Sequence, residues 1–248
     1  MIDYKNYQPA ANILTDKVIA VTGAGSGIGR AIALGFAQYG ATVILIGKTV
    51  SKLESLYDEI EAAGYPQAAI FPLDFATATT DQYQELHNGI EQHFGRLDGL
   101  LNNAAILGAR SSIASYKLKT FSDVMQVNVT ATFAVTHYLL PLLQQSADAS
   151  IIFTGSSVGY QGRAYWGAYA VSKAATENLM QTLADEMDGV SKIRANSINP
   201  GATRTKMRAA AYPAEDPNKL QAPADLLPLY LYLMGPDSRG VNGQQFSP

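Results

Sequence analysis

Short apolar runs alternate along this chain with longer segments whose apolar residues recur every three or four positions. The runs suit buried β-strands, and the longer segments suit amphipathic helices. Strand–helix–strand units build parallel sheets with helices on both faces, so we predict an α/β fold with a doubly wound, mostly parallel sheet of about seven strands. Strands are expected at 17–22, 41–46, 68–73, 98–103, 150–155 and 193–198, followed by a last helix over 224–234 and a short strand at 243–246.

Capping patterns and glycines mark the expected helix ends. SKLE at 51–54 predicts a capping box, and TFSD at 120–123 resembles one. Gly40, Gly64 and Gly95 stand where helices are expected to stop in a left-handed conformation.

Composition limits the classes of protein that fit. The 248 residues are 47% hydrophobic and 16% charged, so we expect one domain over 1–248 with a large core. Within it, 1–14 is interpreted as a short N-terminal extension and 204–223 as a substrate-side loop or lid. A net charge of −3 gives no reason to expect nucleic acid or a membrane as partner. Cysteine is absent and no signal-peptide pattern is found, so the expected location is cytoplasmic.

The stretch VTGAGSGIGRAIALGF at 21–36 follows the first expected strand and opens the first helix. Glycines suit a turn where backbone approaches a pyrophosphate, and the helix N-terminus offers free N–H groups to that anion. We therefore predict a dinucleotide site in a Rossmann-type three-layer sandwich. The alternative is a tight turn without a ligand. The residues expected at the cofactor are Gly23, Ser26, Gly27, Ile28 and Gly29.

The end of the second strand bears on the choice of dinucleotide. A carboxylate there would bind a free ribose 2′-hydroxyl, whereas a basic residue would favour a 2′-phosphate. Gly47 is followed by Lys48 and Thr49, with no carboxylate. We therefore favour NADP(H) over NAD(H). The alternative is that Lys48 is an ordinary solvated lysine.

Tyr169 and Lys173 stand four residues apart in AYWGAYAVSKAATEN, so on a helix they share one face. A phenol with a pKa near 10 is a poor base at neutral pH, and a nearby cation would lower that pKa. This spacing alone also fits a half-buried ring beside a solvated amine.

Seven motifs occur in one order from about residue 15 to residue 246, and in this the chain resembles the short-chain dehydrogenase/reductase family. Its finer pattern looks closest to the YciK-type branch of bacterial oxidoreductases. The pattern departs from the family at Ala105, where glycine is usual. The motifs are TGAGSGIG at 22–29, Asp74, NNAA at 102–105, Asn128, GSSVG at 155–159, YAVSK at 169–173 and NPGATRT at 199–205.

The resemblance implies a catalytic set. In it Tyr169 is the general acid/base, and Ser156 hydrogen-bonds and orients the reacting oxygen. Lys173 binds the nicotinamide ribose and lowers the pKa of the tyrosine. Asn128 holds a water that links Lys173 to solvent. Ser157 is a competing serine, one residue out of register.

The resemblance also implies further contacts with the cofactor. Asp74, with Phe75 beside it, would lie at the adenine, although Asp74 could instead cap a turn. Asn102 and Ala104 would lie on the ribose side. The nicotinamide half of the cleft would be lined by Pro200, Gly201, Thr203 and Thr205.

Several residues stay open. We interpret the three histidines as surface or half-buried helix residues and expect no metal. Arg204, Lys206 and Arg208 could meet an anionic substrate group or could be solvated. The family forms a wall of the substrate cleft with the segment that holds Arg163, Tyr165 and Trp166; for Trp166, core or subunit packing is the alternative. The histidines are His87, His93 and His137.

The function predicted is an NADP(H)-dependent oxidoreductase that interconverts a carbonyl and a secondary alcohol. A small-molecule substrate is expected, and the family suggests a homotetramer or homodimer. Two alternatives stay open: a protein that senses NADP(H) on the same fold without turnover, and a methyltransferase, which also uses glycine turns.

Overall fold

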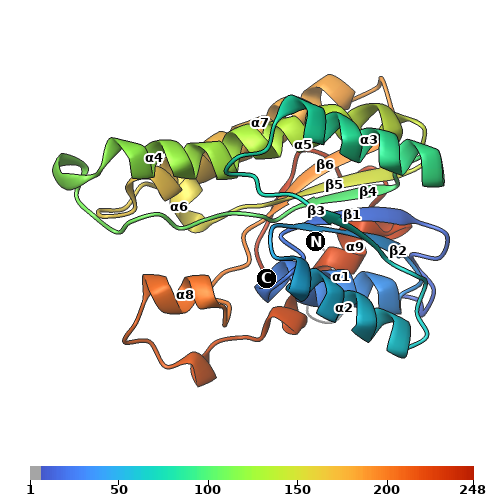
Figure 1. Ribbon diagram of the computed structural model, residues 1–248, viewed down its shortest axis with the longest axis horizontal. Helices are drawn as coiled ribbons and strands as arrows, with labels where there is room; N and C mark the ends of the chain where they lie inside the picture. The colour runs from blue at the N-terminus through green and yellow to red at the C-terminus, as the bar shows by residue number, and fades with distance from the viewer. Residues whose placement is uncertain (1–6) are drawn as a thin grey trace.

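A seven-stranded, all-parallel sheet organises the protein in the computed structural model, which describes residues 7–248 (Figure 1). The strand order is β3-β2-β1-β4-β5-β6-β7, so the order reverses between β1 and β4. The predicted doubly wound parallel sheet is thus confirmed. The strands are β1 (Val18–Thr22), β2 (Thr42–Gly47), β3 (Ala69–Pro72), β4 (Gly99–Asn102), β5 (Ala149–Thr154), β6 (Ile193–Ile198) and β7 (Gln245–Phe246).

Helices cover both faces of the sheet. Figure 1 shows α1, α2 and α9 below the sheet and α3, α4, α5 and α7 above it, with α8 apart at the end where α4 and α6 lie. The bounds are α1 (Gly27–Gln38), α2 (Val50–Ala62), α3 (Thr80–Phe94), α4 (Leu118–Met125), α5 (Ala131–Gln144), α6 (Ser157–Tyr160), α7 (Gly167–Met187), α8 (Lys206–Ala211) and α9 (Leu227–Met234). Within residues 7–248, no helix combines the length and apolar character needed to cross a bilayer.

The central strands are buried on both faces, which explains their unbroken apolar runs. In β1, Ile19 and Val21 pack in the cluster beneath α1 and α9, while Val18 and Ala20 pack in the cluster beneath α3 and α5. All four side chains are buried. Alternate residues of one strand therefore contribute to two separate cores.

The helix ends differ in part from the sequence prediction. Gly40, Gly64 and Gly95 have φ values of 98°, 71° and 70°, as expected for left-handed helix stops. Both proposed capping boxes are wrong, because α2 already begins at Val50 and α4 at Leu118, so each pattern lies inside its helix. A capping box instead forms at the start of α3, between Thr79 and Gln82.

The ends of the chain pack against the same layer. Of the predicted extension 1–14, residues 1–6 lie outside the described residues, but Leu14 is fully buried in the core and Tyr7 donates a hydrogen bond to Asp237 (2.7 Å). The segment 204–223 contains helix α8 as well as loop. Its two ends are tied, because the backbone N–H of Arg204 donates to the carbonyl of Gln221 (2.9 Å).

We expect Gly29→Ala to lower the free energy of unfolding by about 1–3 kcal/mol, since the added Cβ would overlap the carbonyl oxygen of Gly23. Gly89→Ala is the matched control, because Gly89 lies within α3 and a Cβ there meets nothing within 4 Å. In the control variant, the free energy of unfolding should rise by about 0.5–1 kcal/mol, because alanine has a higher helix propensity than glycine. Urea unfolding measures both, and equal effects would contradict the packing role of Gly29.

Candidate active site

A cavity of about 920 Å³ opens at the carboxyl ends of the strands, where the strand order reverses. In doubly wound sheets this is where ligands bind. Most of the residues predicted to bind a cofactor or to react line it. They are Gly23, Ser26, Gly27, Ile28, Lys48, Thr49, Asp74, Phe75, Ala104, Ser156, Tyr169, Lys173, Pro200, Gly201, Thr203 and Thr205.

The glycine turn presents bare backbone to this cavity. Gly23 and Gly27 have φ values of 70° and 57°, which side chains disfavour. Ser26 is the N-cap of α1 but makes no side-chain cap, and the first turn holds no acidic residue. The first N–H groups of α1 therefore remain open to an anion, which suits the pyrophosphate of a dinucleotide.

Gly29 has a different role from its neighbours, because it does not line the cavity. Its Cα faces the carbonyl of Gly23 and the amide of Asn103 closely enough that a Cβ would overlap both. Gly29 thus lets α1 pack against the ends of β1 and β4.

The two asparagines at the end of β4, Asn102 within the strand and Asn103 directly after it, have different positions from those predicted. Asn102 does not line the cavity; its side chain is buried and donates to Thr136 Oγ1 (3.0 Å). Asn103 lines the cavity instead, and its side chain donates to the carbonyl of Thr22 (3.1 Å). The Thr22 hydroxyl also accepts from the backbone N–H groups of Asn103 (2.9 Å) and Ala104 (3.1 Å). These bonds join the end of β1 to the loop after β4.

Positive charge gathers where the second strand ends. Lys48 and Lys52 line the cavity, and neither has an ion-pair partner among residues 7–248. Arg30 also lines it, but Arg30 forms an ion pair with Glu59. Lys52 was not predicted from the sequence: Lys48 precedes α2, which begins at Val50, so helical spacing did not link the two lysines.

The sequence left two roles open for Asp74, a position at the cofactor and the capping of a turn. Its Oδ1 accepts from the backbone N–H of Ala76 (3.1 Å), so the side chain does cap a turn. Asp74 also lines the cavity, next to Phe75. The carboxylate therefore sits at the cavity wall in a fixed orientation.

Tyr169 and Lys173 meet at the inner end of the cavity, one turn apart on α7. The Lys173 Nζ lies 5.7 Å from the centre of the Tyr169 ring and donates to the carbonyl of Thr154 (2.7 Å). Burial raises the pKa of Tyr169 to about 12, while a hydrogen bond with Ser156 acts in the opposite direction. Burial is the larger of these two causes and Lys173 is not one of them, so the lowering of the tyrosine pKa by the lysine stays a prediction.

Lys173 is itself perturbed. It is buried, and burial lowers its pKa to about 8, while the charge of Glu177 one turn further along α7 raises it. Glu177 is also buried and accepts a hydrogen bond from Ser197 Oγ (2.7 Å). The tyrosine, lysine and glutamate thus form a row at i, i+4 and i+8 that leads from the cavity into the core.

Asn128 supports this row without lining the cavity. It lies in a π-helical turn, Gln126–Thr130, between α4 and α5, an interruption that the sequence did not reveal. Its side chain accepts from the N–H of Ile106 (2.8 Å) and donates to the carbonyl of Ile106 (3.0 Å). The amide is also 3.0 Å from Ser172 Oγ, which donates to the carbonyl of Tyr169 (2.8 Å). Asn128 therefore links the loop after β4 to the tyrosine helix.

Trp166 and the segment after β6 form the other side of the cleft. Trp166 is 8% exposed, lines the cavity and lies 5.7 Å from Tyr169 between ring centres. Trp166 is therefore both a packed side chain and part of the cleft wall. Thr203 donates to the carbonyl of Pro200 (2.9 Å), and Thr205 caps α8 by accepting from the N–H of Arg208 (3.1 Å).

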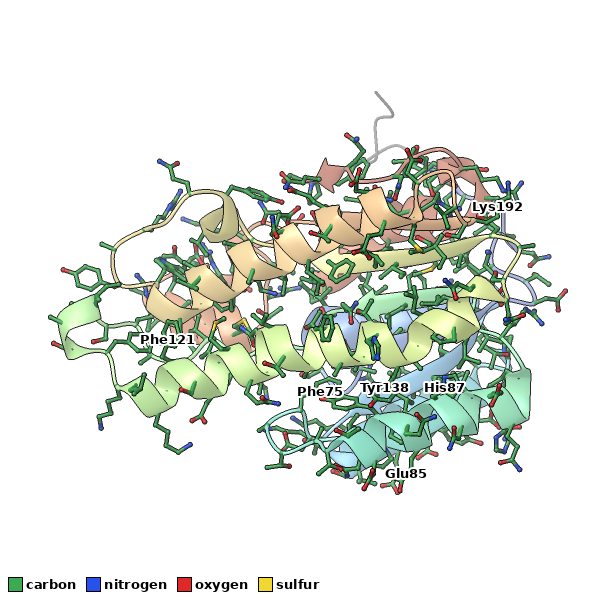
Figure 2. All side chains as sticks on the ribbon, turned by 90° about the horizontal axis from the view of Figure 1, so that it is seen from above. Phe75, Glu85, His87, Phe121, Tyr138 and Lys192 are labelled. Atoms are coloured by element: carbon green, nitrogen blue, oxygen red, sulfur yellow. The ribbon has the colours of Figure 1, made fainter. Side chains whose placement is uncertain are left out.

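The histidines lie outside this site. Figure 2 shows His87 on α3 close to Tyr138 on α5, and its Nδ1 is 2.8 Å from the carbonyl oxygen of Tyr138. His93 Nδ1 is 2.8 Å from the carbonyl of Gly89, and His137 stacks on Phe133. Across residues 7–248, no group of three or more His, Cys, Asp or Glu side chains is placed to hold a metal ion.

Comparison with known proteins decides the family. The family model described as short chain dehydrogenase matches residues 17–216. The chain belongs to the short-chain dehydrogenase family. It is 51% identical over 241 residues to the Escherichia coli K12 oxidoreductase YciK, covering 97% of this chain and 95% of YciK. The resemblance drawn from the motifs, including its YciK-type branch, is confirmed, and this short-chain dehydrogenase is an oxidoreductase.

Solved structures of short-chain dehydrogenases agree with the fold. A structure from Pseudomonas syringae is 56% identical, covers 98% of each chain and superposes with a TM-score of 0.96. A structure from Shigella flexneri 2a strain 301, complexed with NADP, is 50% identical over 96% of this chain and 99% of its own, with a TM-score of 0.93. The Rossmann-type sandwich predicted for this short-chain dehydrogenase is confirmed.

We expect Glu177→Gln to lower the pKa of Lys173 below its value of about 8, because the carboxylate charge that favours the ammonium is lost. The side chain stays charged below its pKa, so its loss of charge as pH rises should move to lower pH. NMR titration of the lysine Nζ, assigned with Lys173→Met, measures this.

Glu186→Gln, at an exposed position of the same helix, is the matched control and should leave the Lys173 titration unchanged. An identical titration in wild type and Glu177→Gln would contradict the coupling.

Proposed function

We propose that the protein is an NADP(H)-dependent oxidoreductase that interconverts a carbonyl and a secondary alcohol. The observation that carries the proposal is the convergence of Tyr169, Ser156 and Lys173 on the cavity that also holds the glycine turn. A half-buried phenol hydrogen-bonded to a serine, beside a buried lysine, suits proton transfer at a carbonyl oxygen.

The cofactor would lie along the cavity. The open N–H groups of α1 would hold the pyrophosphate, Asp74 and Phe75 would border the adenine, and Lys48 with Lys52 would bind a 2′-phosphate. The NADP complex of a relative 50% identical supports this choice. Bound cofactor would supply the hydride.

The protein's own residues would then handle the proton. Ser156 would donate a hydrogen bond to the substrate carbonyl and hold it toward Tyr169. Because burial keeps the pKa of Tyr169 at about 12, the phenol is protonated at neutral pH and is ready to give its proton during reduction. Lys173, still largely charged below its pKa of about 8, would stabilise the phenolate that remains. Asn128 would keep the tyrosine helix in register with the loop after β4.

The segment 204–223 would border the bound substrate. Arg204, Thr205 and Lys206 line the cavity, and Thr205 lies close to Gly27, so this segment forms the wall next to the glycine turn. We therefore assign it the role of the substrate-side lid that its composition predicts.

Tyr169→Phe should reduce turnover of carbonyl compounds at least about 100-fold, because the proton donor is lost. NADPH binding should stay close to wild type. Oxidation of NADPH, followed at 340 nm with a panel of ketones and aldehydes, gives the rate, and NADPH fluorescence gives the binding.

Tyr138→Phe on α5 is the matched control and should keep full activity, since Tyr138 does not line the cavity. Tight NADPH binding without turnover of any carbonyl by the wild type would instead favour the cofactor-sensing alternative.

Lys48→Ala should weaken NADPH binding about tenfold and leave NADH binding nearly unchanged, because only NADPH carries the 2′-phosphate. Lys192→Ala removes an equal charge before β6, at the opposite ends of the strands, and should change neither. Equal losses for the two cofactors in Lys48→Ala would contradict the assignment of Lys48.

A further inference from the structure

A second, smaller cavity of about 250 Å³ adjoins the large one on the substrate side. Five residues line both cavities: Ser156, Trp166, Asn199, Gly201 and Arg208. Since a water molecule takes about 30 Å³ in the liquid, the smaller cavity accommodates a short organic group but not a nucleotide. A substrate whose carbonyl lies at Ser156 would therefore extend its remaining atoms into this space.

The charge in this small cavity is one-sided. Arg163 and Arg208 line it, and no acidic residue does. Arg208 is already compensated, because its Nε and one terminal nitrogen each lie 2.6 Å from a carboxylate oxygen of Glu215. Its guanidinium also lies 3.9 Å from the centre of the Tyr212 ring. Arg208 is thus held as a structural ion pair at the wall.

Arg163 is the uncompensated charge of this lining. Its guanidinium has neither an ion-pair nor a hydrogen-bond partner in the part of the chain that the structure describes. The nearby Arg110 does not line either cavity; its guanidinium lies over Trp166 (4.6 Å) and donates to the carbonyl of Ala211 (2.6 Å).

A tight turn holds Arg163 at the small cavity. The backbone N–H of Trp166 donates to the carbonyl of Arg163 (3.3 Å), and Tyr165 between them has a φ of 71°. A positive φ at the third position is typical of a type II turn, although a side chain there is disfavoured. Arg163 and Trp166 both line the cavity; Arg163, like Tyr165, is exposed to solvent, whereas Trp166 is buried.

We propose that the small cavity binds a carboxylate of the substrate through Arg163, so that the substrate is an oxo acid or the corresponding hydroxy acid. This rests on the proposed function for the carbonyl end. A guanidinium matches the planar carboxylate with two parallel hydrogen bonds. One uncompensated positive charge fits a monoanion, whereas a phosphate monoester brings a charge of about −1.5 to −2.

Binding of the acid end can be tested without turnover, because Trp166 is the only tryptophan and lines both cavities. The NADP⁺ complex is titrated with butanoate, butanamide and propyl phosphate while tryptophan fluorescence is recorded. Butanoate should bind at least about tenfold more tightly than the uncharged amide. Equal affinity for butanoate and butanamide, or tighter binding of propyl phosphate than of butanoate, would overturn the proposal.

Variants assign the effect to Arg163. Arg163→Met should weaken butanoate binding about tenfold and leave butanamide unchanged, whereas Arg163→Lys should retain part of the preference. Lys192→Met is the control of equal charge, and Figure 2 shows Lys192 at the other end of the molecule from Phe121 of α4. Unchanged butanoate affinity in Arg163→Met would overturn the assignment. An error in the proposed function would show in a different experiment, because the Tyr169→Phe variant would then retain its activity.

Discussion

The close contact between the β1–α1 turn and the loop after β4 is the constraint on which the cleft depends. Thr22 bonds to the two residues that follow Asn102, and Gly29 leaves room for Asn103 against the carbonyl of Gly23. Because β1 and β4 are neighbours at which the strand order reverses, their outgoing loops diverge to opposite faces of the sheet. The space between those loops becomes the cavity, and the same contact fixes its inner wall.

Burial then decides the chemistry of the inner end. Tyr169 is kept protonated and Lys173 is brought toward neutrality by the same loss of solvent, which disfavours each charged form. Glu177 opposes this for the lysine from within the core. The π-helical turn that carries Asn128 joins the tyrosine helix to the wall of the cleft through Ile106. Contacts among three separate segments, the π-helical turn, the loop after β4 and α7, thus hold Tyr169 in place.

Charge divides the long cleft into two ends with different tasks. Lys48 and Lys52 stand at the end of β2, while Arg163 stands beyond Trp166 at the other end. Two other cations of the linings are paired, Arg30 with Glu59 and Arg208 with Glu215, whereas Arg204 and Lys206 line the large cavity without an ion-pair partner among residues 7–248. We assign Lys48 and Lys52 to a phosphate-bearing cofactor and Arg163 to an acidic substrate.

Local pattern was enough to predict the strands, the glycine turn and the Tyr169–Lys173 pair, because strand burial, backbone freedom and helical spacing are properties of neighbouring residues. It was also enough for the left-handed stops at Gly40, Gly64 and Gly95. It misplaced the capping boxes, since tertiary packing lets α2 and α4 begin earlier than their polar residues suggest. The sequence alone does not distinguish Asn102 from Asn103, because they are neighbouring residues of the same type. Only the register of β4 against β1 decides which of the two residues lines the cavity. In the same way, the pairing of Arg208 with Glu215 and the unpaired state of Arg163 depend on how α8 folds back over the cleft, which no local spacing encodes.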